Sequence, residues 1–329
     1  MIRPPVPLLG LLLGTLAVVG AAPFLGAEPI GVGVLWAEPD SIAAYIFWTL
    51  RVPRVAVALL AGAGLAVGGM AFQAMFRNPL ATPFTLGTSS GAALGASLCI
   101  HLGWRFSALG VSAITLCALG GAVLSIVLVY GLTRVRAGFS TASMLLAGVA
   151  VSFFFSSLIL LLQYLSDFTR TFRMIRWVMG GLDRVVGYDD VWSIVPFVGA
   201  AALVIVYLTR ELNLLVTGEE LAAGRGVDVN RTKVLLFFAA SMAVGGIVAV
   251  CGPIGFIGLM APHICRLLVG ADHRVLAPAT LLFGGGFLVA CDTVARTVIA
   301  PTELPVGIIT ALLGGPFFLW LLLSNRRLA

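Results

Sequence analysis

Charged side chains are scarce in this sequence, and lysine is almost missing from it. Only 10% of the 329 residues are charged, and the cations are nineteen arginines and a single lysine, Lys233. Soluble domains carry roughly a quarter of their residues as Asp, Glu, Lys and Arg, whereas this chain is 60% hydrophobic with a mean hydropathy of +1.09. The composition excludes an ordinary soluble domain and predicts a polytopic membrane protein.

Short motifs that would indicate chemistry are also missing. The sequence has no P-loop, and Lys233 lacks the preceding glycines that a phosphate-binding lysine needs. His101, His263 and His273 are too far apart for a local metal motif, and the five cysteines stand singly in apolar segments. We therefore predict buried thiols, no metal site, no bound ATP and no catalytic residues. The sequence also has no basic patch interleaved with aromatic residues, the pattern that would indicate nucleic-acid binding.

Long apolar runs are abundant instead. A helix needs about 20 apolar residues to cross the hydrocarbon core, and ten segments qualify when short or tilted spans are allowed. They are approximately 6–25, 47–71, 84–103, 107–132, 141–165, 190–208, 234–251, 254–269, 276–298 and 306–324. Such continuous spans must be helices, because lipid leaves exposed backbone groups unsatisfied and barrel strands are shorter. We predict an all-α polytopic membrane protein with about ten transmembrane helices and a single domain, 1–329.

The longest polar interruption is residues 210–233, which holds eight of the 34 charges. A loop so long and so charged must lie in water, and its composition is typical of a docking surface. Within it, Gly218-Glu219-Glu220 precedes two alanines and Gly226. This pattern predicts a short helix with acids in its first turn, where the helix dipole favours them, and a glycine stop.

Arginine placement gives the predicted orientation. With a cytoplasmic amino terminus, twelve basic residues lie in inside loops and eight in outside loops, a weak positive-inside bias. The inside set is Arg3, Arg77, Arg134, Arg136, Arg210, Arg225, Arg231, Lys233, Arg266, Arg274, Arg326 and Arg327. The outside set is Arg51, Arg54, Arg105, Arg170, Arg173, Arg176, Arg184 and Arg296. So many outside arginines indicate an acidic partner or an anionic solute.

Glycines and helix breakers indicate how the spans pack. Stretches such as AGAGLAVGG (61–69) let helix backbones approach closely. Asn78-Pro79 with Pro83, and Gly252-Pro253, place irregular backbone beside apolar runs. Irregular backbone at membrane depth is tolerated only where protein or a water-filled cavity surrounds it, so we expect both breaks inside the bundle.

Several long motifs then carry a family resemblance. They are RVPRVAVALLAGAGLAVGGMAFQAMFRNPLATPFTLGTSSGAALGA (51–96), MLLAGVA (144–150), WVMGGL (177–182), GEELAAGRGV (218–227), GPIGFIGLMAPHICRLLVGADHR (252–274) and ELPVGIITALLGGPFFLWLL (303–322). In this order and spacing the chain resembles, over nearly its whole length, the FecCD-type permease subunits of ABC importers for iron chelates, haem and vitamin B12.

The resemblance implies a ten-helix, type II importer permease in the bacterial inner membrane with both termini cytoplasmic. It implies a pair of permeases with the pathway along the dimer interface, two ATPase subunits beneath and one periplasmic binding protein above. ATP and Mg would then sit on the ATPases, with no cofactor in this subunit. A homodimer is expected, and a heterodimer with a related permease remains an alternative.

The resemblance also gives roles to residues. The segment 218–226 is similar to coupling helices that fit a cleft of the ATPase. Its residues are Gly218, Glu219, Glu220, Ala222, Ala223, Gly224, Arg225 and Gly226. Arg51, Arg54 and Arg296 match arginines that meet glutamates of the binding protein. The alternatives are snorkelling towards headgroups or, for Arg296, an internal i,i+4 pair with Asp292.

A translocation path is the least defined feature. Arg170, Arg173 and Arg176 are spaced by three, so on a helix they would share one face and attract haem propionates or a carboxylate siderophore. The alternative is a solvated outer loop. The candidate path residues are Gln73, Ser89, Ser90, Gln163, Arg173 and Arg176. The intramembrane polar groups among them also suit bonds between helices.

The sequence therefore predicts the permease of an ABC importer that carries a metal chelate, a ferric siderophore or haem, with cobalamin as the alternative cargo. A rival class is a secondary transporter driven by an ion gradient. Such transporters place ionisable residues deep within spans, and here Asp292 is the chief one. Co-elution with an ATPase would separate the two classes.

Overall fold

We analysed a computed structural model, which describes residues 6–26, 28–33, 40–108, 110–135 and 141–324. The helices are α1 (Val6–Ala21), η1 (Ala22–Phe24), α3 (Ile42–Tyr45), η2 (Ile46–Arg51), α4 (Val52–Phe76), η3 (Pro83–Leu86), α5 (Thr88–Leu102), α6 (Ala113–Val135), α7 (Thr141–Leu165), α8 (Phe168–Val178), α9 (Tyr188–Tyr207), α10 (Thr209–Thr217), α11 (Glu219–Gly224), α12 (Val229–Cys251), α13 (Ile257–Val269), α14 (His273–Thr297) and α15 (Val306–Ser324). Strands β1 (Ser107–Ala108) and β2 (Val111–Ser112) form a small antiparallel hairpin.

The predicted all-α membrane fold is confirmed, and a helix overlaps each of the ten expected spans. Seven helical segments in the described residues are long and apolar enough to cross a membrane. Helices α5, α13 and α15 supply the remaining expected spans but are shorter or less apolar. The span expected at 107–132 begins at Ala113 instead, because the β1–β2 hairpin occupies its first residues.

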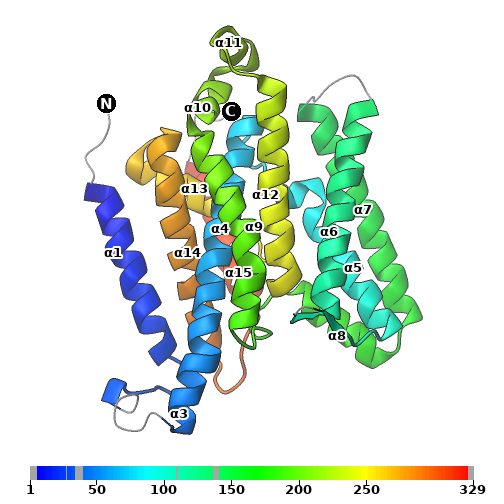
Figure 1. Cartoon of the computed structure of the whole chain (residues 1–329), viewed down its shortest axis with the longest axis vertical. Coiled ribbons are helices and arrows are strands. Elements are labelled where there is room, and N and C mark those ends of the chain that lie inside the picture. The colour runs from blue at the N-terminus through cyan, green and yellow to red at the C-terminus, as the bar shows by residue number, and fades with distance from the viewer. Residues whose placement is uncertain (1–5, 27, 34–39, 109, 136–140, 325–329) are drawn as a thin grey trace.

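Helix α4 is the central element of the bundle (Figure 1). It packs against α14, α12, α9 and α13, while α5, α6 and α7 form a second group that joins the centre through α12. Helix α1 lies at the periphery, against α14. The buried core is accordingly richest along α4, α12 and α14.

Backbone contacts between helices explain the glycine content of these spans. A methyl group on Gly69 of α4 would overlap the carbonyl oxygen of Gly258 on α13, and one on Gly62 would overlap that of Gly284 on α14. Hydrophobicity gives no drive for helices to associate in lipid, so close van der Waals contact must hold the bundle together. The glycines therefore set the distance between α4 and its neighbours.

The second predicted helix break and Pro83 of the first lie inside the bundle, whereas Asn78-Pro79 does not. Pro83 and Gly252 are buried, but Pro79 is exposed and Leu80 beside it is 58% exposed. Residues 82–85, 255, 256, 258 and 259 line one cavity of about 220 Å³. On the α4 side, the Gln73 amide donates to the carbonyl oxygen of Gly258 over 3.2 Å. The expectation for breaks at membrane depth thus holds for the second break and is wrong for Asn78-Pro79.

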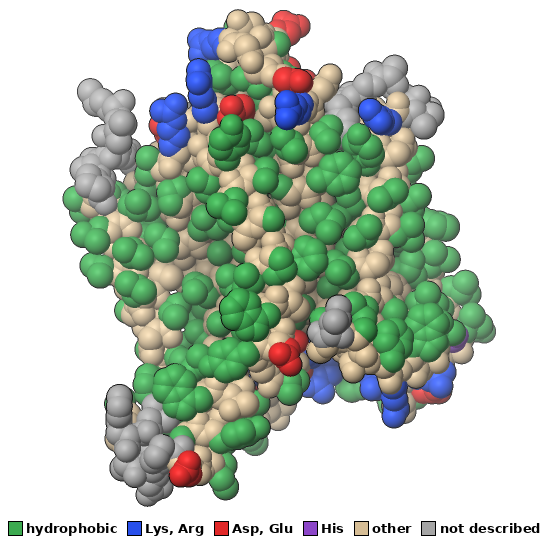
Figure 2. All heavy atoms as spheres, viewed as in Figure 1, with side chains coloured by type: hydrophobic (Ala, Val, Ile, Leu, Met, Phe, Trp, Pro, Cys, Tyr) green, Lys and Arg blue, Asp and Glu red, His purple; other side chains and the backbone are tan. Residues whose placement is uncertain are grey.

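The molecule has two polar ends. We call the one carrying α10 and α11 the α11 end, and the one carrying η2, the hairpin and α8 the α8 end (Figure 1). Figure 2 shows charged side chains at these ends and a broad band of hydrophobic side chains between them. The described chain starts and finishes near the α11 end, at Val6 and Ser324. Arg3, Arg136, Arg326 and Arg327 lie outside the described residues.

Candidate functional sites

The polar stretch 210–233 is mostly helical, which corrects the expectation of a loop. Helix α10, helix α11 and the first turn of α12 occupy it, so its polar side chains lie on short helices at the α11 end. The short helix predicted around Glu219 and Glu220 is confirmed as α11. Gly218 precedes it at φ 131° and Gly226 follows at φ 86°, both in the left-handed region that favours glycine.

The residues of α11 divide into an inner and an outer face. Ala222 is fully buried, whereas Glu220, Ala223, Gly224, Arg225 and Gly226 are exposed. Leu221 is also 60% exposed, and sequence reasoning did not single it out. Ala222 therefore anchors α11 to the body of the protein, while Leu221 and its polar neighbours form a surface open to a partner.

An ion pair fixes α11 to α12. The ammonium of Lys233, the chain's single lysine, lies 2.7 Å from Oε1 of Glu219, and its side chain is only 3% exposed. Lysine is seldom so buried unless it is paired. Sequence reasoning noted both residues but not their contact, because they are fourteen positions apart with a turn between them.

A second polar junction ties α10 to α14. The Asn213 amide donates to Oδ1 of Asp272 over 2.8 Å, and its own oxygen accepts the backbone N–H of His273 over 2.9 Å. Asp272 also caps α14 by accepting from the backbone N–H of Arg274. These two bonds to the charged form, first the backbone N–H and then the Asn213 amide, lower the pKa of Asp272.

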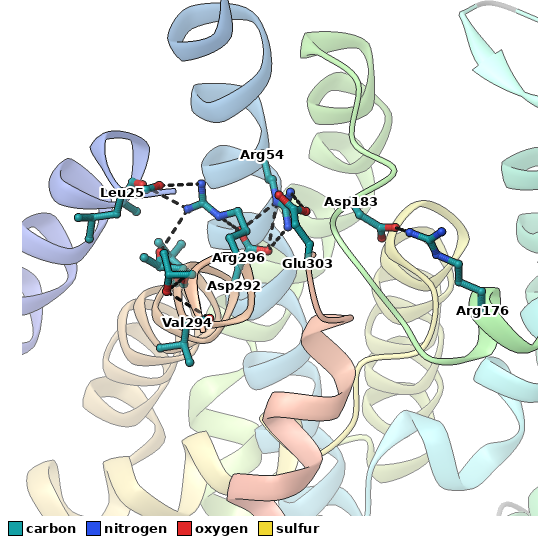
Figure 3. Close-up of polar contacts among 12 residues, drawn as sticks. Leu25, Arg54, Arg176, Asp183, Asp292, Val294, Arg296 and Glu303 are labelled. Carbon is teal, nitrogen blue, oxygen red and sulfur yellow. Dashed lines mark hydrogen bonds and ion pairs between the residues drawn. The ribbon is translucent and has the colours of Figure 1, made fainter. Parts of the chain in front are cut away.

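At the α8 end, two of the three expected docking arginines, Arg54 and Arg296, belong to one ion network (Figure 3). Arg54 on α4 reaches Oδ1 of Asp292 on α14 over 2.8 Å and Oε2 of Glu303 over 2.7 Å. Arg296 pairs with Asp292 over 3.1 Å, which is the internal i,i+4 contact named above as the alternative. Arg296 also donates to the carbonyl oxygens of Ala22 and Leu25.

The three arginines therefore differ in access. Arg296 is only 3% exposed, so in this structure it presents no surface to a partner. The Arg54 side chain is 11% exposed. Arg51 is partly exposed and donates to the carbonyl oxygens of Pro23 and Glu28. The contact between Arg54 and Asp292 spans 238 positions and had no signal in the sequence.

The segment that carries Arg170, Arg173 and Arg176 is helical, as the predicted shared face requires; it forms α8. Arg173 and Arg176 line a cavity of about 740 Å³ at the α8 end, with Trp177, Asp183 and Arg184. Arg176 pairs with Asp183 over 3.0 Å (Figure 3), and Arg184 stacks on the Trp177 ring at 5.5 Å from its centroid. Arg170 faces elsewhere and donates to the carbonyl oxygen of His101.

The other expected path residues do not gather at this cavity. Gln73 is buried between α4 and α13. Ser89 and Ser90 begin α5, where the Ser90 hydroxyl donates to the Gly87 carbonyl. Gln163 lies on α7, and its backbone oxygen accepts the hydroxyl proton of Thr171 at the start of α8. Only the Gln73 contact is a side-chain bond between helices, the alternative named above. The Ser90 bond is local to the start of α5, and the Gln163 contact uses its backbone oxygen.

No group of three or more His, Cys, Asp or Glu side chains that could hold a metal ion occurs within the described ranges. His263 packs edge-on against Phe317, with the ring centroids 5.8 Å apart. His101 bonds the Ser166 hydroxyl through Nδ1. These histidines have structural contacts of the kind expected for packed or capping residues.

The protein is a membrane-spanning helical bundle with an exposed short helix at one end and a charged cavity at the other. Residues 11–324 match the FecCD transport family, and the chain belongs to that family. Permeases of this family are transport subunits, and a separate ATPase hydrolyses ATP. The protein is thus an all-α, multi-pass ABC importer permease.

Its relatives include permeases with different named cargoes. The chain is 38% identical to the hemin transport system permease protein HmuU of Yersinia pestis, covering 97% of this chain and 96% of that one. It is 43% identical to the cobalamin import system permease protein BtuC of Halobacterium salinarum, over 90% and 77% of the two lengths. It is also 37% identical to the uncharacterized ABC transporter permease protein YvrB of Bacillus subtilis, over 97% and 90%.

A solved permease chain has the same fold. It comes from an ABC transporter assigned to the metal-chelate type, in an inward-facing conformation. The TM-score is 0.87 at 31% identity, with 98% of this chain and 100% of that chain covered. A second neighbour, from the PsaBC complex of Streptococcus pneumoniae, has a TM-score of 0.52 at 15% identity and is alike in fold alone.

Proposed function

We propose that this permease carries a metal chelate, a ferric siderophore or haem, from the periplasm to the cytoplasm through the interface of a permease homodimer. The α11 end faces the cytoplasm, so both termini are cytoplasmic, in a bacterial inner membrane. A substrate-binding protein docks at the α8 end, and two ATPase subunits bind the α11 end.

The observation that carries this proposal is the construction of α11. The six-residue helix α11 projects from the bundle with Glu220 and Leu221 exposed, which suits a surface that a partner covers. Because α11 is attached to α12 through Lys233 and to the core through Ala222, a displacement of α11 would be transmitted to the spans. Closure of an ATPase pair around such a helix becomes a rigid-body tilt of the bundle.

The cavity beside α8 offers arginine side chains to a cargo, although its lining is balanced in charge. Arg173, Arg176 and Arg184 are matched there by Asp183, Asp189 and Asp190, and Arg176 is paired with Asp183. Trp177 adds an aromatic face, and the volume of about 740 Å³ is in the range of small-molecule sites. Carboxylates of a siderophore or haem propionates would pair with the guanidinium groups. Gln73, Ser89, Ser90 and Gln163 stay candidate path residues outside the lining of this cavity.

Cobalamin is the second candidate cargo, because the relative named as a cobalamin permease is 43% identical to this chain. The deciding experiment is retention of cargo by the binding protein of the same transport system. That protein, purified and offered haem, a ferric siderophore and cobalamin in turn, should retain an iron complex. Selective retention of cobalamin would overturn the iron assignment, and retention of none of the three would overturn both.

Partner binding has its own test. Affinity purification of this permease from membranes should yield an ATP-binding-cassette ATPase in a one-to-one ratio with it. Purification of the permease alone, with gradient-driven transport, would favour a secondary transporter.

A further inference from the structure

The two carboxylates that hold Arg54 have very different surroundings. Asp292 is 1% exposed and is shared with Arg296, so Arg54 and Arg296 enclose it between α4 and α14. Glu303 is 38% exposed and lies on the segment that leads from α14 into α15 (Figure 3). Only Glu303 stands on the solvent side of the Arg54 guanidinium.

The two carboxylates use different nitrogens of the Arg54 guanidinium. Nη1 of Arg54 bonds Oε2 of Glu303 over 2.7 Å, while Nε and Nη2 bond Asp292. Glu303 thus holds the nitrogen that Asp292 leaves open, and an acidic side chain arriving from outside would compete with Glu303 there. Displacing Asp292 instead would leave a buried carboxylate with one partner fewer, which costs far more.

We propose that Glu303 is an internal stand-in for the acidic side chain of the docking protein at Arg54. This inference rests on the docking role given above to the α8 end. Until docking, Glu303 keeps the Arg54 charge paired. On docking, a partner carboxylate takes its place, so the affinity of the complex reflects the difference between two similar ion pairs.

The exchange leaves the rest of the segment in place. Leu304 donates its backbone N–H to the carbonyl oxygen of Ala295 over 3.0 Å, and Gly307 donates to that of Gly180 over 3.1 Å. These bonds fix the start of α15 independently of Glu303. Docking thus frees the Glu303 side chain without releasing α15.

The test measures binding of the loaded substrate-binding protein of the same transport system to the intact transporter in nanodiscs. Glu303→Gln removes the competing charge, and we expect the dissociation constant to fall by about threefold to tenfold, the range of one partly exposed ion pair. Glu303→Ala is a second variant with the same expectation. Asp40→Asn is the matched control, because Asp40 is an exposed carboxylate at the same end; it should change the constant by less than about twofold.

A double-mutant cycle identifies the competitor. In an Arg54→Gln background, Glu303→Gln should no longer tighten binding. If Glu303→Gln and Asp40→Asn act equally, or if Glu303→Gln weakens binding, the stand-in role is wrong while docking at this end can still hold. If Glu303→Gln and the double variant Arg54→Gln/Glu303→Gln bind alike, Arg54 is no docking residue, and both the stand-in role and that part of the proposed function are wrong.

Discussion

Removal of the Glu219 charge is the sharpest perturbation of α11. Glu219→Gln keeps the size of the side chain but leaves the ammonium of Lys233, 3% exposed, without its anion. A fully buried charge that loses its partner destabilises by roughly 3–5 kcal/mol. Because Glu219 itself is 39% exposed and water can reach the pair, we expect about 1.4–2.8 kcal/mol. Undocking of α11 should therefore become about tenfold to hundredfold more frequent.

The single lysine provides a direct assay. Acylation of its amine by a membrane-permeable ester, followed by mass spectrometry of the peptide that contains it, reports how often α11 leaves α12. We expect Glu219→Gln to raise the acylation rate of Lys233 at least about tenfold. Arg231→Gln removes an exposed cation from the same end of α12 and serves as the control. In the assembled transporter, Glu219→Gln should also increase the ATP hydrolysed per molecule transported.

Equal acylation of Lys233 in wild type and in Glu219→Gln would show that the ion pair does not hold α11 on α12. Faster acylation with an unchanged ratio of transport to hydrolysis would show that α11 does not couple the ATPase to the spans. Lys233→Arg keeps the charge and should couple nearly as well as wild type, whereas Lys233→Met should not.

Four further predictions concern other parts of the chain. Gly69→Ala drives a methyl group into the Gly258 carbonyl and should cost about 1–3 kcal/mol; thermal unfolding in detergent should show a clear loss, whereas Gly10→Ala, which meets nothing within 4 Å, should not, and equal midpoints would contradict the packing. Arg176→Ala should weaken uptake of an anionic chelate by about tenfold, and unchanged uptake in transport assays would remove the α8 cavity from the path. The double change Arg51→Glu and Arg54→Glu should weaken association of the binding protein by at least about tenfold, with an unaltered complex in a pull-down as the opposing result. The pKa of Asp272 is lowered, so its stabilising bonds are fully present above the ordinary value of about 4 and are lost as pH falls through the lowered value. The difference in melting temperature between wild type and Asp272→Ala should therefore be constant from about pH 8 to 6 and shrink below about pH 4. A difference that shrinks near neutral pH would contradict this.

Apolar length predicted the spans well where nothing competed with helix formation. The expected span 141–165 coincides with α7. The expected start of the fourth span was wrong, because a short hairpin can use the same apolar residues before Ala113. The stretch 210–233 was expected to be a loop, since its charges mask amphipathic helices that bury Leu212, Leu215 and Ala222.

The site was predictable only as far as its contacts are local. The pair of Asp292 with Arg296 is visible in the sequence because i,i+4 residues share a helix face. The bonds from Arg54 to Asp292 and Glu303 depend on how α4 packs against α14, which glycine contacts such as Gly62 with Gly284 determine. No pattern of residue types records that packing, so the stand-in role of Glu303 emerged from the structure alone.

Reconstitution tests the central claim most directly. The permease would be placed in proteoliposomes with the ATPase that co-purifies with it and the loaded binding protein, and uptake of the chelate would be followed with and without ATP. If the permease is the transport subunit of an ATP-driven importer, uptake should occur only when ATP, the ATPase and the permease are all present. Uptake by the permease alone, driven by a proton or sodium gradient, would contradict it.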